Sequence, residues 1–176
     1  SFSSGGGTKA QGAGAFSTGL QTVALANYSF ASGNQTSASS AYSISEGIQT
    51  HASGTAAHAS GDKSLAEGYA SNASGRSTTA SADYSSARGH NTVAYESYQF
   101  VIGEYNATKS SKSPFIIGKG TAGSRSNAFR VDNSGNVYNT TGTYTSGADY
   151  AEFFESLSGE AIPLGTVVEL SGSKII

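Results

Sequence analysis

The chain has 176 residues, of which 36% are hydrophobic and 12% are charged, and its formal net charge is −2. It contains no cysteine, which excludes a disulfide framework, a thiolate metal site and a thiol nucleophile. No basic cluster is present, and no apolar run approaches the ~18 residues of a membrane span, so nucleic-acid binding and membrane insertion are disfavoured. The absence of methionine indicates an internal or processed piece of a longer protein.

The first half of the chain consists largely of a seven-residue repeat. Residues 8–98 divide without a gap into 13 segments with the consensus [ST]-x-A-x-G-x-x; place one is Ser or Thr in 11, place three is Ala in 11, and place five is Gly in 9. A coiled coil is excluded because the segments lack two large apolar seam positions and usually contain Gly, which costs a helix about 1 kcal/mol. Each segment therefore predicts a short strand followed by a turn.

The alternation along each segment predicts which places face inward. Places one, three and five carry small residues and are expected inside, whereas places two and four are expected to point outward. Two segments would form one coil of an all-β roll, with successive coils about 4.8 Å apart. Such a small-residue interior buries little apolar surface, so we expect symmetric partner chains. The outward residues expected to line the shared axis are Phe16, Val23, Leu25, Phe30, Ile44, Leu65 and Val93, with Tyr95 beside them.

The segments "SLAEGYASNASG" and "THASGTAAHASG" resemble the head of trimeric autotransporter adhesins. That resemblance implies a left-handed parallel β-roll of 14-residue coils, two heptads each, assembled as a homotrimer. The family favours Val and Ile beside the Ala, whereas this chain often has Ser, Thr or His, which implies a looser or wetter axis.

Different modules are expected after Tyr98. Residues 99–113 are interpreted as a neck or linker, and residues 114–147 as a β-hairpin module whose connection is the turn-rich Asn133–Asn136. The segment "SGADYAEFFESLSG" then changes character. Asp149 and Glu152 have the spacing of a helix capping box, and an apolar stripe follows from Tyr150 to Leu157. The residues alone predict a short helix from about Tyr150 to Leu157 that docks on the trimer.

The sequence "SGADYAEFFESLSGEAIPLGTVVELSGSKI" is similar to the start of the self-cleaving intramolecular chaperone domain of phage pre-neck appendage and tail-spike proteins, a glutamic-peptidase family. The upstream "FVIGEYN" and "SRSNAFRVDNSGNVY" resemble the segment that leads into it. The resemblance implies a scissile bond between Ala148 and Asp149 and a catalytic carboxylate at Glu152, with Asp149 completing the motif.

The residue before the expected scissile bond departs from related sites. Ala148 stands where they can have Ser, so water or another side chain would have to be the nucleophile. Residues 148–176 are interpreted as the truncated start of the domain, and we expect the bond to stay intact in this piece. Self-cleavage is the one enzymatic activity considered.

His51 and His58 hold place two in adjacent segments and form a candidate axial ion site in a trimer, with exposed or stacked structural His as the alternative. No metal motif and no cofactor motif is recognised.

The features together favour a homotrimeric phage tail-fibre or appendage protein that attaches to the host surface. Its expected location is the virion, and its expected partner is a host receptor, a glycan or another surface polymer. The alternative is a bacterial surface adhesin of the trimeric autotransporter type, which predicts a coiled-coil stalk and membrane anchor downstream.

Overall fold

The computed structural model describes residues 1–108, 112–139, 155–156, 170–171 and 174–175. Every regular element in these residues is a strand, and they contain no helix. The chain divides into two units, Ser1–Gly142 and Thr143–Ile176. Each unit is described by itself below.

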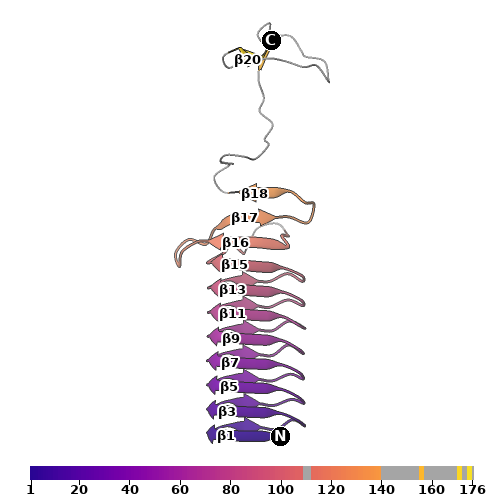
Figure 1. Ribbon diagram of the computed structural model, residues 1–176, viewed down its shortest axis with the longest axis vertical. Helices are drawn as coiled ribbons and strands as arrows, with labels where there is room; N and C mark the ends of the chain where they lie inside the picture. Colours follow the sequence, from indigo (N-terminus) through magenta and orange to yellow (C-terminus); the bar gives the residue numbers. More distant parts are fainter. Residues whose placement is uncertain (109–111, 140–154, 157–169, 172–173, 176) are drawn as a thin grey trace. The chain divides into compact units, whose positions relative to one another are not determined.

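Long and short strands alternate through the first unit (Figure 1). The long strands are β1 (Phe2–Gly6), β3 (Phe16–Leu20), β5 (Phe30–Asn34), β7 (Ile44–Ile48), β9 (His58–Asp62), β11 (Asn72–Arg76), β13 (Ser86–His90) and β15 (Phe100–Glu104). The short strands are β2 (Lys9–Ala10), β4 (Val23–Ala24), β6 (Ser37–Ala38), β8 (His51–Ala52), β10 (Leu65–Ala66), β12 (Thr79–Ala80) and β14 (Val93–Ala94).

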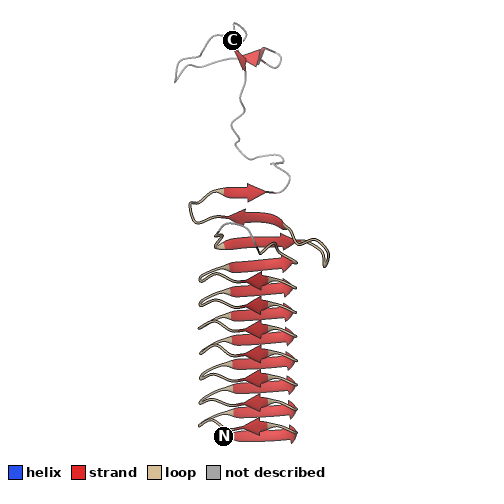
Figure 2. Cartoon of the chain, turned by 180° about the vertical axis from the view of Figure 1, so that it is seen from behind, coloured by secondary structure: helices blue, strands red, loops and turns tan. Residues whose placement is uncertain are grey.

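The strands stack in parallel to form two sheets, one from the long strands and one from the short strands (Figure 2). Phe16 pairs with Phe30 and Phe30 with Ile44 in the long sheet, and Val23 pairs with Ser37 in the short sheet, so the register advances by 14 residues per coil. The prediction of an all-β parallel roll with two heptads per coil is confirmed.

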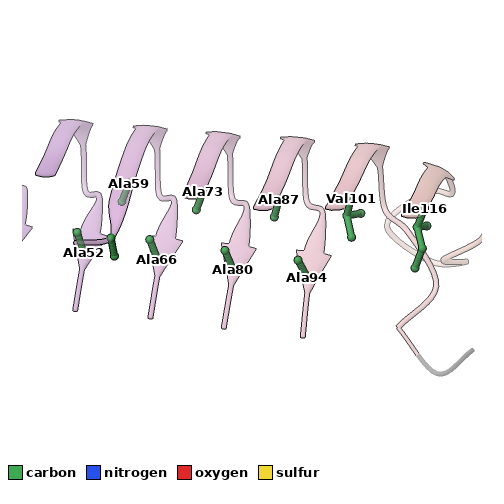
Figure 3. Packing of buried hydrophobic residues seen from close by; sticks show 10 residues of the cluster. Ala52, Ala59, Ala66, Ala73, Ala80, Ala87, Ala94, Val101 and Ile116 are labelled. Atoms are coloured by element: carbon green, nitrogen blue, oxygen red, sulfur yellow. The ribbon is translucent and has the colours of Figure 1, made fainter. Parts of the chain in front are cut away.

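Alanine fills the space between the two sheets (Figure 3). Place three of the strands is occupied by Ala31, Ala38, Ala52 and Ala59 among others, and these side chains are fully buried. Place one is buried too. Ser43 Oγ, for example, donates to the Ser40 carbonyl at 2.6 Å, whereas the buried hydroxyl groups of Thr36, Ser71 and Thr92 have no hydrogen-bond partner. Small side chains let the sheets approach closely.

Place five of the long strands is not an interior position, contrary to the expectation from alternation. Gly33 and Gly47 are only partly buried, and Gly47 has φ +114°. A Cβ added to Gly47 would lie 2.1 Å from the carbonyl oxygen of Gly61 in the next coil. Glycine recurs there because the stacked backbones leave no room for a side chain, so the repeat reflects coil contact and not burial.

Place seven forms the corners of the roll and adopts the left-handed conformation in coil after coil. Non-glycine residues such as Gln35 and Tyr42 have φ of 57° and 60°, a conformation that costs about 1–2 kcal/mol. A hydrogen bond to the preceding coil offsets this cost: the Gln35 N–H donates to the Leu20 carbonyl at 2.8 Å. The corners therefore also join neighbouring coils.

The roll extends beyond residues 8–98 at both ends. Residues 1–7 form a further segment that contributes β1, and β15 lies inside the expected linker 99–113, where Phe100 pairs with Ser86. The linker interpretation is therefore corrected for residues 100–104. The repeat there reads "QFVIGEY", whose Gln and Val replace the consensus Ser and Ala, and this replacement hid the register.

Three more strands continue the long sheet. They are β16 (Phe115–Lys119), parallel to β15, and β17 (Asn127–Val131) and β18 (Val137–Asn139), which are antiparallel. The predicted hairpin around Asn133–Asn136 is confirmed as the connection between β17 and β18.

The second unit contains β19 (Glu155–Ser156), β20 (Leu170–Ser171) and β21 (Lys174–Ile175). β21 pairs in parallel with β19 and antiparallel with β20. The predicted helix from Tyr150 to Leu157 falls mainly outside the described residues. Its two described residues, Glu155–Ser156, are a strand, because their backbone pairs with β21 and does not form a helical turn.

Candidate functional site

The predicted cleavage junction lies outside the described residues. This holds for Ala148 and Asp149 on either side of the expected scissile bond and for the expected catalytic Glu152. Their assignment stays a prediction.

The hairpin that precedes the junction in sequence contains a carboxylate with several hydrogen-bond donors. Asp132 Oδ1 accepts from the backbone N–H groups of Ser134 and Asn136, both at 2.9 Å, and Oδ2 accepts from Asn136 Nδ2 and the Tyr138 hydroxyl, both at 3.0 Å. The side-chain hydrogen bond from Asn136 is the largest cause that lowers the pKa of Asp132 from 3.8 to about 2. Asp132 therefore holds the turn and is occupied by the protein's own donors.

The residues predicted to share one trimer axis lie on two different sheets. Phe16, Phe30 and Ile44 begin the long strands β3, β5 and β7. The others belong to the short sheet or to the turn after it: Val23, Leu65 and Val93 begin β4, β10 and β14, and Leu25 follows β4. Since the alanines of both sheets point between them, the outward residues of the two sheets occupy opposite faces.

Phenylalanine rings stack along the outer face of the long sheet. The ring centroids of Phe2 and Phe16 are 5.0 Å apart and those of Phe16 and Phe30 are 5.3 Å apart, with nearly parallel planes. Ile44 continues this column in the next coil. We call Phe2, Phe16, Phe30 and Ile44 the phenylalanine ladder. Its end residues, Phe2 and Ile44, are 55% and 38% exposed.

The two histidines of the candidate ion site are not brought together within one chain. His51 lies in β8 of the short sheet, and His58 lies in β9 of the long sheet. His58 Nε2 is 3.3 Å from Glu46 Oε1, and its Nδ1 is 3.4 Å from Asn72 Nδ2. No group of three or more metal-binding side chains occurs in the described part of the chain. A site formed by three copies of His51, or by three copies of His58, in a trimer stays a prediction.

Tyrosines gather at one corner of the roll, a feature that sequence reasoning missed. In the repeat region every tyrosine lies in the turn that follows a short strand: Tyr28, Tyr42, Tyr69, Tyr84, Tyr95 and Tyr98. We call this the tyrosine corner. Aligning the odd-numbered heptads in one column and the even-numbered heptads in another would have revealed this corner, because the tyrosines then fall in one column.

Two carboxamide side chains terminate the short sheet. Asn106 Oδ1 accepts from the Val93 N–H at 2.8 Å, and Asn106 Nδ2 donates to the Val93 carbonyl at 3.0 Å. Gln99 Oε1 accepts from the Tyr95 N–H at 2.9 Å, and Gln99 Nε2 donates to the Ser113 carbonyl at 2.8 Å. Both are buried at place one, where earlier coils have Ser, Thr or Ala. The amide of Asn106 occupies the position where the next coil's backbone would bond.

A polar hollow lies beside the turn that contains Glu96 and Ser97. It is lined by Glu96, Ser97, Lys112, Pro114 and Asn133. The Ser113 N–H donates to Glu96 Oε2 at 3.2 Å, and the Asn133 N–H donates to the Lys112 carbonyl at 3.3 Å. The hollow thus joins the end of the roll to the β17–β18 hairpin. Across the described residues, no helix has the length and apolar character needed to cross a membrane.

The C-terminal part of the chain matches a protein-family model. Residues 98–176 match the model of Peptidase_G2, the IMC autoproteolytic cleavage domain. The match begins at the last turn of the tyrosine corner and includes β15 to β21. A search of curated proteins found no match. The β-solenoid and the intramolecular chaperone cleavage domain that matches residues 98–176 together fit a phage tail-fibre protein.

Proposed function

We propose that the chain is part of a homotrimeric phage tail fibre or appendage that attaches the virion to the host surface. The observation that carries the proposal is the match to an autoproteolytic cleavage domain over residues 98–176, which begins at the last coil of a stack of parallel coils. A stack of coils supplies a stiff rod, and a self-cleaving domain supplies a processing step at its C-terminal side. An adhesin head would explain the roll but not this match.

The phenylalanine ladder supports the homotrimeric part of the proposal. A column of stacked aromatic and aliphatic side chains on one face is an apolar strip that a soluble rod covers with partner chains. Symmetric copies stacked coil against coil would place three ladders along one axis. The outer face of the long sheet is therefore the proposed trimer interface.

The proposed processing reaction is hydrolysis of the Ala148–Asp149 bond. Glu152 would accept a proton from water as the water attacks the Ala148 carbonyl, and the proton would pass to the departing Asp149 nitrogen. Water is the co-reactant. The products would be a new carboxyl group at Ala148 and a new amino group at Asp149.

Mass spectrometry of a protein that contains the complete cleavage domain tests this reaction. The wild type is expected as two pieces that separate before Asp149, and Glu152→Gln is expected as one uncut chain, because the amide keeps the shape but cannot accept the proton. Glu155→Gln, three residues on, is the matched control and is expected to be cut. Equal cleavage of wild type and Glu152→Gln would remove Glu152 from the chemistry, and an uncut wild type would contradict the proposed junction.

A further inference from the structure

The aromatic residues of the roll are segregated by chemistry. Phenylalanine lies on the long sheet, at Phe2, Phe16, Phe30 and Phe100, whereas every tyrosine of residues 8–98 lies in the corner that follows the short strands; Tyr105, after β15, lies outside that corner. Phenylalanine has no polar group and suits a dry interface. Tyrosine has an apolar ring and a hydroxyl group and suits a surface that stays in contact with water. The two faces are therefore built for different partners.

Ring contacts divide the tyrosine corner into two clusters. Tyr28 and Tyr42 stack with centroids 5.4 Å apart in the lower cluster. In the upper cluster Tyr84 stacks on Tyr98 at 5.1 Å, and Tyr69 meets Tyr84 edge to face at 5.4 Å. Tyr98 is 71% exposed and Tyr84 is 49% exposed. The upper cluster presents stacked ring surface to solvent, and Tyr84 and Tyr98 each occupy a left-handed corner of the backbone.

Carboxylates lie in the turns of the upper cluster and not in those of the lower one. Glu67, Asp83 and Glu96 lie in the same turns as its tyrosines, and Asp83 Oδ1 accepts from the Tyr69 N–H at 2.8 Å. The turns of the tyrosine corner contain no lysine, arginine or histidine. Lys112 lines the adjoining hollow together with Glu96.

These observations select the ligand class. An anionic polymer would be repelled by the three carboxylates, which Lys112 and Arg130 offset only in part; Arg130 Nη1 donates to Ser113 Oγ at 3.2 Å, next to Glu96. The apolar face of an uncharged sugar ring can lie on a tyrosine ring, and its hydroxyl groups can donate to carboxylates and accept from Lys112 or Asn133. We propose that the upper tyrosine cluster, Tyr69, Tyr84 and Tyr98, together with the hollow beside Glu96, is a binding site for an uncharged glycan. This assignment rests on the proposed attachment function and locates it on the chain.

Binding of the 176-residue chain to immobilised neutral hexose and N-acetylhexosamine oligosaccharides tests the site, with sialylated oligosaccharides as the anionic comparison. The Tyr84→Ala/Tyr98→Ala variant is expected to lose at least ~10-fold in affinity for the neutral probes, since aromatic anchors dominate such contacts. Its fold should persist, because Ala56 and Ala70 occupy the same corner position with φ of 57° and 49°.

The matched control is Tyr28→Ala/Tyr42→Ala, which removes the same number of stacked rings from the same corner without the carboxylates and the hollow. It is expected to bind like the wild type. A Glu96→Gln variant keeps every tyrosine and is expected to weaken binding through the hollow alone. Raising the salt concentration should change the affinity little, since the ligand carries no charge.

Several results would overturn the site. These are no binding to any neutral probe, equal binding by wild type and Tyr84→Ala/Tyr98→Ala, and preferential binding of the sialylated probes. Failure of the attachment proposal is measured separately, by adsorption of the parent fibre to host cells. A parent fibre that adsorbs equally well with Tyr84→Ala/Tyr98→Ala contradicts the glycan site alone, whereas a wild-type fibre that does not adsorb contradicts the attachment function.

Discussion

Gly47 shows what the recurrent glycine of the long strands does. Its φ is +114°, and an added Cβ would lie 2.1 Å from the Gly61 carbonyl oxygen. A side chain at this position therefore has no room. Gly47→Ala is therefore expected to lower the free energy of unfolding by at least about 2 kcal/mol. Gly123→Ala is the control, because an added Cβ there meets nothing within 4 Å. Chemical denaturation measures both, and equal stability of the two variants would contradict the coil-contact role of Gly47.

Asp132 makes the hairpin turn sensitive to acid. Its pKa is lowered to about 2 in the folded chain, below the ordinary 3.8, so the stabilisation from its carboxylate is present above pH 3.8 and is lost as pH falls through about 2. Titration of the side-chain carboxyl carbon by NMR is expected to give a pKa near 2. Asn136→Ala removes the largest cause and should move the pKa back toward 3.8. A wild-type pKa near 3.8 would contradict the hydrogen-bonded turn.

Asn106 shows how the short sheet ends. Its amide reproduces one acceptor and one donor of a missing strand, so Asn106→Ala leaves the Val93 N–H and carbonyl without these partners. The expected cost is about 2 kcal/mol, accompanied by faster hydrogen exchange of the Val93 amide. Asn34→Ala, at an exposed position of β5, is the control and should change neither quantity. Unchanged protection of Val93 in Asn106→Ala would contradict the capping role.

The strands and coils could be predicted from the sequence because the heptad constrains every coil in the same way. Place one, place three and the two-segment coil follow from small residues that recur at fixed spacing. Place five could not be assigned by alternation, since Gly47 is kept by a neighbouring backbone and not by burial. The final coil was missed because Gln99 and Val101 replace the consensus residues where the roll is capped.

The candidate sites were less predictable than the fold. A single list of outward residues could not separate Phe30 from Val23, because their faces differ only once odd and even segments form different sheets. The tyrosine corner depends on the same separation. The Asp-Tyr-Ala-Glu motif at the junction was recognised by resemblance, and the family match over residues 98–176 supports that resemblance without assigning its residues.

The whole rod is expected to exist as a trimer whose chains meet along the phenylalanine ladder. A charged group at Phe30 would bring three carboxylates to one apolar axis and should prevent assembly. Val23→Asp places the same carboxylate on the short sheet and is the matched control. The comparison therefore tests both the oligomeric state and the face that forms the interface.

Light scattering coupled to size-exclusion chromatography, at micromolar concentration, is the most direct measurement of this central claim. The account predicts three times the chain mass for the wild type and for Val23→Asp, and a dissociated or aggregated species for Phe30→Asp. A well-folded wild-type monomer would contradict the trimeric rod. A trimer that survives Phe30→Asp but is lost in Val23→Asp would show that the short sheet, and not the long sheet, faces the axis.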